Sequence, residues 1–258
     1  MTKSAKSKPR VAFITGGASG IGLATAERML AAGWKVAIAD RDEAALAAAR
    51  KRFGAQKAVR IAPLDVTDEA AVVLTLETVA GDLGGLDGVV NSAGIAADMH
   101  VLDTPVELFR KILDVNVVGS FLVGRAAARI MKGSGSGAIV NIASVAGLRG
   151  SKGRAAYGSS KGAVITLSQV MATDLARYGI RVNAVCPGPV ETPMVKQIHD
   201  AATRQVWLRH VPMRRYGIPD EIASVIEFLL DGTRSGYVTG EVIAADGGFR
   251  GAGIMTDD

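Results

Sequence analysis

Short apolar segments alternate with longer amphipathic segments along the whole chain. In most of the short segments every position is apolar, rather than every second one, which is typical of strands that helices cover on both faces. Such strands are parallel, because a crossover helix separates each one from the next. The pattern predicts seven strands, at residues 11–15, 35–39, 59–64, 88–91, 137–142, 181–185 and 241–245.

The segments between these strands carry apolar residues at helical spacing. Residues 21–32, for example, stop at Gly33, and a glycine just beyond the last turn is a common helix end. Two longer helices are predicted at residues 106–131 and 157–178. Strict alternation of strands and helices with right-handed connections predicts an α/β fold: a single doubly wound, Rossmann-type domain with a seven-stranded parallel sheet and helices on both faces.

The composition fits one such domain of 258 residues, with 48% apolar but only 5% aromatic residues. The net charge of +5 has one local cluster, formed by Lys3, Lys6, Lys8 and Arg10. We therefore expect a flexible basic tail at residues 1–9 and a single domain at residues 10–258. Elsewhere the cationic residues are scattered, and no aromatic residue lies within the cluster, which argues against a nucleic-acid partner.

Cysteine usage and hydropathy predict a soluble protein of the cytoplasm. Cys186 is the one cysteine of the chain, so it cannot form an intrachain disulfide. No apolar run reaches the ~18 residues of a membrane span, and no apolar segment of signal length precedes the first strand. We therefore expect no membrane partner.

A glycine-rich turn connects the first predicted strand to the first predicted helix. Glycines let a ligand approach the backbone closely, and the amino terminus of the following helix attracts a pyrophosphate. We therefore expect the domain to bind a dinucleotide through Gly16, Ser19, Gly20, Ile21 and Gly22.

Asp40 and Arg41 follow the second predicted strand. Side chains at this position determine whether such a domain binds NAD or NADP. A carboxylate there can accept hydrogen bonds from both hydroxyls of the adenosine ribose, and it repels a 2′-phosphate. The neighbouring guanidinium of Arg41 could instead hold such a phosphate, which leaves NADP as the alternative. The sequence favours NAD as the cofactor, with Asp40 and Arg41 both in contact with it.

Motifs along nearly the whole chain follow a recognisable order. They are Thr15-Gly16-x-x-x-Gly20-x-Gly22, Asp65-Val66, Asn91-Ser92-Ala93-Gly94, Asn116, Ser144, Tyr157-Gly-Ser-Ser-Lys161, Pro187-Gly188 and Thr192. In this set and order the chain resembles the short-chain dehydrogenase/reductase family. The one departure is Ser92, which stands where that family often has a second Asn and which we expect to be a packing position.

The resemblance implies further contacts with the cofactor. It puts Asp65 and Val66 beside the adenine, Asn91 and Gly94 along the adenosine ribose, and Thr192 near the nicotinamide carboxamide. The remaining contacts that it implies are Ala93, Tyr157, Lys161, Pro187, Gly188 and Val190.

The family also implies a homo-oligomer, a tetramer, that pairs subunits through the two long helices. Small side chains on these helices would let the subunits approach closely. Those residues are Ala126, Ala127, Ala128, Ala163 and Ala172.

Tyr157 and Lys161 lie four residues apart in a helical segment, so they share one face of the helix. A free tyrosine has a pKa near 10, and we expect the Lys161 ammonium and the positive nicotinamide ring to lower it. The resemblance adds Ser144 to polarise the substrate oxygen and Asn116 to hold a water that links Lys161 to solvent. The predicted catalytic set is therefore Asn116, Ser144, Tyr157 and Lys161, with no metal.

These residues predict hydride transfer between NAD and a small secondary alcohol or ketone, such as a polyol, a sugar or a hydroxy acid, with Tyr157 as general acid and base. Residues 189–212 are expected to form a mobile lid. The predicted substrate pocket comprises Val145, Ala146, Pro189, Met194, Ile198 and Trp207, with Arg149 and Arg154 as candidates for attracting an acidic group. The alternatives are an NADPH-dependent 3-oxoacyl thioester reductase and a non-catalytic regulator that senses a dinucleotide.

Overall fold

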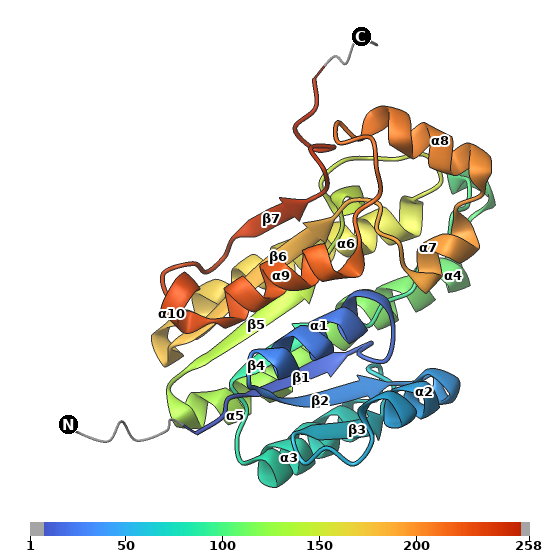
Figure 1. Ribbon diagram of the computed structural model, residues 1–258. Helices are drawn as coiled ribbons and strands as arrows, with labels where there is room; N and C mark the ends of the chain where they lie inside the picture. The colour runs from blue at the N-terminus through green and yellow to red at the C-terminus, as the bar shows by residue number, and fades with distance from the viewer. Residues whose placement is uncertain (1–7, 254–258) are drawn as a thin grey trace.

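The computed structural model describes residues 8–253, and within them a parallel sheet of seven strands forms the centre of the molecule (Figure 1). The strands are β1 (Val11–Thr15), β2 (Lys35–Asp40), β3 (Val59–Pro63), β4 (Gly88–Asn91), β5 (Gly137–Ile142), β6 (Ile180–Pro187) and β7 (Val242–Ala245). They lie in the order β3-β2-β1-β4-β5-β6-β7, which confirms the predicted doubly wound sheet. The chain reverses its direction of travel across the sheet between β1 and β4. In such sheets a ligand binds beyond the carboxyl ends of the strands at this reversal.

Helices cover both faces of the sheet (Figure 1). One face packs against α1 (Gly20–Ala31), α2 (Glu43–Phe53) and α9 (Pro219–Leu230), and the other against α3 (Glu69–Leu83), α5 (Gly119–Ser134) and α6 (Ala155–Leu175). The two resulting cores are almost entirely aliphatic, with Met29, Leu46 and Ile226 buried in the first and Leu76 and Met171 in the second. An aliphatic core of this kind follows from the low aromatic content of the chain.

The remaining helices lie at the ends of the sheet. Beyond the carboxyl ends of the strands are α7 (Pro193–Ile198) and α8 (Ala201–His210), which occupy much of the segment expected to form a lid (Figure 1). The short helices η1 (Val101–Asp103) and η3 (Val145–Gly147) follow β4 and β5, and η4 (Ala176–Tyr178) and α10 (Gly232–Ser235) follow α6 and α9.

The helix predicted at residues 106–131 is not one regular α-helix. It consists of α4 (Val106–Leu113), a π-helical turn η2 (Asp114–Val118) and α5. A π-helical turn inserts one residue into the usual hydrogen-bonding pattern and often marks a functional position. Here it contains Asn116, one of the predicted catalytic residues.

The basic residues near the amino terminus divide into two groups. Lys3 and Lys6 lie outside the described residues. Lys8 donates a hydrogen bond to the Gly84 carbonyl. Arg10 forms an ion pair with Asp231 at 3.0 Å. Lys8 and Arg10 therefore contact the domain through their side chains. Among the helices of residues 8–253, none is long and apolar enough to cross a membrane.

Candidate active site

The glycine-rich turn between β1 and α1 packs so closely that it excludes side chains. A Cβ atom added to Gly22 would lie 2.2 Å from the Gly16 carbonyl oxygen, and Gly16 and Gly20 have positive φ angles of 61° and 51°. A larger residue would therefore displace the turn. Gly22 packs against Gly16 and Gly17 within the turn and does not line the cleft.

Asp40, the last residue of β2, is held beside this turn. Its carboxylate accepts hydrogen bonds from the Ala18 amide at 3.2 Å and the Asp42 amide at 3.2 Å. The next strand places Asp65 nearby, where hydrogen bonds from the amide and the hydroxyl of Thr67, together with the charge of Arg41, lower the pKa of the carboxyl group. The carboxylates of Asp40 and Asp65 therefore lie at the same end of the site.

A cleft with an empty volume of about 1190 Å³, open to solvent, runs from Asp40 past the glycine-rich turn to the end of β5. Nearly all of the predicted cofactor residues line it. They are Gly16, Ser19, Gly20, Ile21, Asp40, Arg41, Asp65, Val66, Ala93, Gly94, Tyr157, Lys161, Pro187, Gly188, Val190 and Thr192. A narrow glycine turn at a helix amino terminus and a fixed carboxylate at the end of β2 fit a dinucleotide with a pyrophosphate and a ribose diol.

Asn91 does not line this cleft, contrary to the sequence interpretation. Its side chain is buried and donates hydrogen bonds to Asn141 Oδ1 at 2.8 Å and to the Ser120 carbonyl at 3.2 Å. The amide therefore joins β4 to β5 and α5 inside the protein. Ser92, by contrast, was expected to be a packing position, and it does line the cleft.

The side chain of Asn116 is buried near Lys161, another predicted catalytic residue, and both hydrogens of its amide nitrogen are used in hydrogen bonds. Its Oδ1 accepts from the Ile95 amide at 2.9 Å, and its Nδ2 donates to the Ile95 carbonyl at 3.0 Å and to Ser160 Oγ at 2.9 Å. Asn116 thus connects the loop after β4 to α6. Since both Nδ2 hydrogens are already used, this side chain could hold the predicted water only as an acceptor.

Ser144, Tyr157 and Lys161 converge at the end of the cleft near β5. Ser144 is hydrogen bonded to the Tyr157 phenol, and its hydroxyl also accepts from the Ala146 amide at 3.1 Å, which fixes its orientation. The Lys161 ammonium donates to the Ile142 carbonyl at 2.7 Å and lies 5.7 Å from the centre of the Tyr157 ring. Three of the predicted catalytic side chains therefore lie together at one end of the cleft.

The expected electrostatics of this trio need correction. Burial raises the pKa of Tyr157, and the hydrogen bond with Ser144 and the charge of Arg154 only partly offset it. Burial also lowers the pKa of Lys161 to about 8. Burial thus disfavours the charged form of both groups, so the buried site by itself opposes the ammonium and phenolate pair that the sequence predicted.

Most of the predicted substrate-pocket residues lie outside the cleft. Met194 lines it, whereas Val145 is buried and Trp207 stacks on His199 with ring centres 5.8 Å apart. Arg149 lies over the ring of Phe249, and Arg154 lies over the ring of Tyr157. Neither arginine lines the cleft. The remaining predicted pocket residues, which also do not line it, are Ala146, Pro189 and Ile198.

Several lining residues were missed because only their place in the fold brings them to the cleft. Most follow strand ends or begin the α7–α8 segment, so their position after a predicted strand was the available signal. They are Leu64, Ser92, Ile95, Val115, Ile142, Ala143, Pro193 and Val195. Within residues 8–253 no cluster of three or more His, Cys, Asp or Glu residues could hold a metal ion.

A family profile described as enoyl-(acyl carrier protein) reductase matches residues 16–250. The matched region contains the glycine-rich turn, Ser144, Tyr157 and Lys161. The chain belongs to the short-chain dehydrogenase/reductase family. It is therefore an NAD(P)-dependent dehydrogenase or reductase that acts on CH–OH groups.

Relatives of this short-chain dehydrogenase include the 2-(R)-hydroxypropyl-CoM dehydrogenase of Xanthobacter autotrophicus, which is 41% identical over 93% of the chain and 98% of the relative. The solved structure of an NAD⁺-bound xylitol dehydrogenase aligns with a TM-score of 0.87 and 37% identity, over 94% of this chain and all of the other. A gluconate 5-dehydrogenase from Burkholderia cenocepacia, solved with NADP and tartrate, aligns with a TM-score of 0.88 and 34% identity, over 94% and 96% of the two chains. Both dinucleotides thus occur among similar structures.

Proposed function

We propose that this chain is an NAD-preferring dehydrogenase of a small secondary alcohol, with Tyr157 as the general acid and base. The observation that carries the proposal is the arrangement of the cleft: Asp40 lies at one end, and the hydrogen-bonded pair of Ser144 and Tyr157 lies at the other. A nicotinamide dinucleotide carries the adenosine ribose diol on one side of its pyrophosphate and the redox-active ring on the other, and the polar groups of the cleft suit these two parts.

The chain's own residues would bind and orient the reactants and move one proton. When bound, the dinucleotide supplies the two-electron redox chemistry. The Ser144 hydroxyl, oriented by the Ala146 amide, holds the substrate oxygen. The Tyr157 phenol takes the hydroxyl proton in oxidation and returns it in reduction. Lys161, with a pKa of about 8, can exchange that proton near neutral pH.

The preference for NAD rests on Asp40. Its carboxylate is fixed by two backbone amides and keeps acceptor capacity for the two ribose hydroxyls. A 2′-phosphate in the same place would meet the negative charges of both Asp40 and Asp65. Arg41 lines the same end of the cleft and would offset part of that repulsion.

Small secondary alcohols are proposed as substrates because relatives of this size act on them. The names of similar proteins include hydroxypropyl-CoM, cis-4-hydroxycyclohexanecarboxylate and xylitol dehydrogenases. A second candidate is the NADPH-dependent reduction of a 3-oxoacyl thioester; the matching family profile also names an acyl-carrier substrate, but for the reduction of an enoyl double bond. A panel of polyols, sugars, hydroxy acids, secondary alcohols and 3-oxoacyl thioesters, assayed at the absorbance band of the reduced nicotinamide, separates the two.

Tyr157→Phe tests the central role in the proposal. The change keeps the ring and deletes the hydroxyl, so we expect NAD binding to persist while turnover falls by ~10²–10⁴-fold, as for a lost general acid or base. Stopped-flow turnover and calorimetric NAD binding on the same protein are the measurements. Turnover near that of the unaltered protein, with NAD binding intact, would refute the assignment of Tyr157.

We also propose a tetramer that pairs subunits through α5 and α6. Three of the alanine residues predicted for this contact, Ala126, Ala127 and Ala172, are buried within the chain's own core and do not support it. Support comes instead from a surface groove between the two helices, whose lining includes Phe121, at 39% exposure, and Met171 and Tyr178.

A further inference from the structure

Arg154, the N-cap residue of α6, lies over the ring of Tyr157 on the side of the α7–α8 segment. Its guanidinium carbon is 5.2 Å from the centre of the ring. The side chain is only 11% exposed, so solvent screens its charge weakly. Arg154 thus places a guanidinium cation beside the phenol.

Two residues from distant parts of the chain hold this guanidinium. Asp98, in the loop after β4, forms an ion pair with Arg154 Nε at 2.8 Å. His199, between α7 and α8, lies with its Nε2 3.3 Å from Arg154 Nη2. The arginine thus has one anchor on the sheet side of the cleft and one on the α7–α8 segment.

The hydrogen bonds determine the protonation state of His199. A guanidinium can only donate, so His199 Nε2 must accept, and the proton must lie on Nδ1, which is 3.0 Å from the Tyr216 hydroxyl. The ring is therefore the neutral Nδ1–H form, and both burial and the charge of Arg154 keep its pKa below the ordinary value. Trp207 of α8 stacks on the same ring at an interplanar angle of 13°, which fixes its orientation.

We propose that Arg154 is a positioning residue for Tyr157, and that His199 connects it to the α7–α8 segment, so that the placement of this segment and the acidity of the phenol are coupled. The inference rests on the proposed role of Tyr157. Arg154 would act through the phenol: its charge favours the phenolate, which is the form that accepts the proton in alcohol oxidation.

Other groups also act on Tyr157 and set the sign of each expected effect. Asp98 and Cys186 disfavour the phenolate, whereas Ser144 and Arg154 favour it. Burial lowers the pKa of Lys161 to about 8, and its Nζ donates to the Ile142 carbonyl at 2.7 Å. Removing Arg154 should consequently shift phenol ionisation to higher pH, and neutralising Asp98 should shift it to lower pH.

Spectroscopic titration of the protein without cofactor tests the proposal directly. The phenolate absorbance of each variant, minus that of the same variant carrying Tyr157→Phe, isolates the ionisation of Tyr157. We expect Arg154→Met to move this ionisation to higher pH, Arg154→Lys to move it less, and Asp98→Asn to move it to lower pH. Arg177→Met is the matched control, because Arg177 lies over the Tyr178 ring at 4.7 Å outside the cleft. It should leave Tyr157 unchanged.

Two variants of His199 separate its hydrogen bonds from its stacking. Gln has an acceptor oxygen and a donor nitrogen in its side chain, so it can replace both hydrogen bonds of His199. Phe keeps the stacking on Trp207 and loses both hydrogen bonds. In His199→Gln we expect Tyr157 to ionise at the same pH as in the unaltered protein. In His199→Phe we expect it to ionise at higher pH, closer to its value in Arg154→Met. Equal behaviour of the two variants would show that His199 does not hold Arg154 through hydrogen bonds.

Kinetics supply the second measurement, with a secondary alcohol that the substrate panel identifies. Arg154→Met should lower kcat for oxidation by about tenfold near neutral pH and leave KM and NADH binding nearly unchanged. At alkaline pH kcat should recover. An unshifted Tyr157 titration, or a loss of kcat that is the same at every pH, would overturn the proposal. If the Tyr157 titration shifts but the protein oxidises no alcohol, the effect of Arg154 on Tyr157 is supported and the proposed function is refuted.

Discussion

At the scale of single residues, short side chains and fixed charges decide what the cleft accepts. Gly22 is required because a Cβ atom there would overlap the Gly16 carbonyl. Asp40 is held by the Ala18 and Asp42 amides, so its carboxylate does not need to reorganise when a ribose binds. The discrimination between NAD and NADP should therefore depend mainly on this one carboxylate.

Asp40→Ala is expected to lower kcat/KM with NAD by roughly tenfold or more, since two hydrogen bonds to the ribose are lost at about 1 kcal/mol each. The kcat/KM with NADP should fall less than that with NAD, or rise, because the negative charge of Asp40 is removed. Steady-state kinetics with both dinucleotides measure the ratio. Asp42→Ala is the control: Asp42 caps α2 through the Ala44 and Ala45 amides, so its loss should reduce stability and leave the cofactor ratio unchanged.

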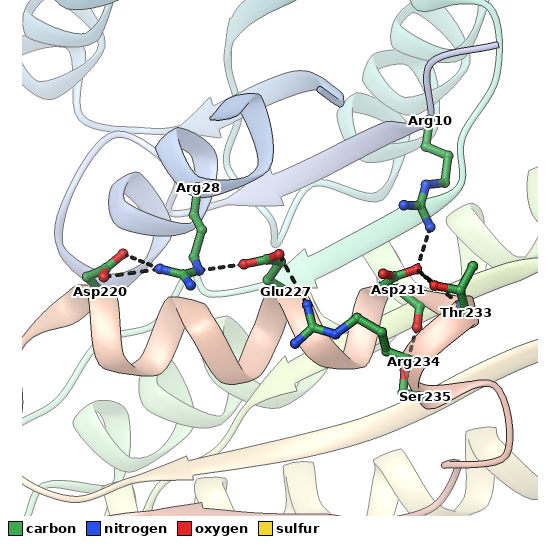
Figure 2. Close-up of polar contacts among 8 residues, drawn as sticks. All are labelled: Arg10, Arg28, Asp220, Glu227, Asp231, Thr233, Arg234 and Ser235. Carbon is green, nitrogen blue, oxygen red and sulfur yellow. Dashed lines mark hydrogen bonds and ion pairs between the residues drawn. The ribbon is translucent and has the colours of Figure 1, made fainter. Parts of the chain in front are cut away.

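At the scale of elements, ion pairs join α1 to α9 across the face of the sheet that they cover. Arg28 of α1 donates to Glu227 at 2.6 Å and to both oxygens of Asp220 at 3.0 and 3.1 Å, so one guanidinium bridges two turns of α9 (Figure 2). Arg10, just before β1, contacts Asp231 at the end of the same helix. These contacts hold the first and last thirds of the domain together.

Arg28→Ala should reduce the free energy of unfolding by about 1 kcal/mol, with a smaller loss at high salt, because the pairs are partly exposed. Chemical denaturation at low and high ionic strength measures both effects. Arg50→Ala removes a pair with Glu43 at 3.6 Å that lies within α2 alone, and we expect almost no change. An equal loss for the two variants would mean that bridging α1 and α9 adds nothing.

At the scale of the whole molecule, the groove between α5 and α6 lies away from the cleft and is where we propose that subunits pair. Phe121→Glu places a carboxylate in that groove and can still pair with Arg125 one turn later, so the helix should persist. We expect light scattering to show a tetramer for the unaltered chain and a smaller species for this variant. Leu74→Glu, an exposed position on α3, should not change the mass. A monomeric unaltered chain would contradict the pairing.

Pattern and local spacing were sufficient for much of this protein. Runs of apolar residues identified all seven strands, because burial on both faces leaves a direct trace in the sequence. The glycine-rich turn and the spacing of Tyr157 and Lys161 are local features, and the structure brings them to one cleft as expected.

Only the tertiary structure decided the direction and the charge state of the side chains around that cleft. Asn91 points into the protein because its partners, Asn141 and Ser120, come from other elements. Lys161 has a pKa of about 8 because of its burial, which no spacing reveals. The contact of Arg154 with His199 joins residues far apart in the sequence. The physical reason is common to all three: burial and long-range contacts depend on which elements meet, whereas pattern records only which face of each element is covered.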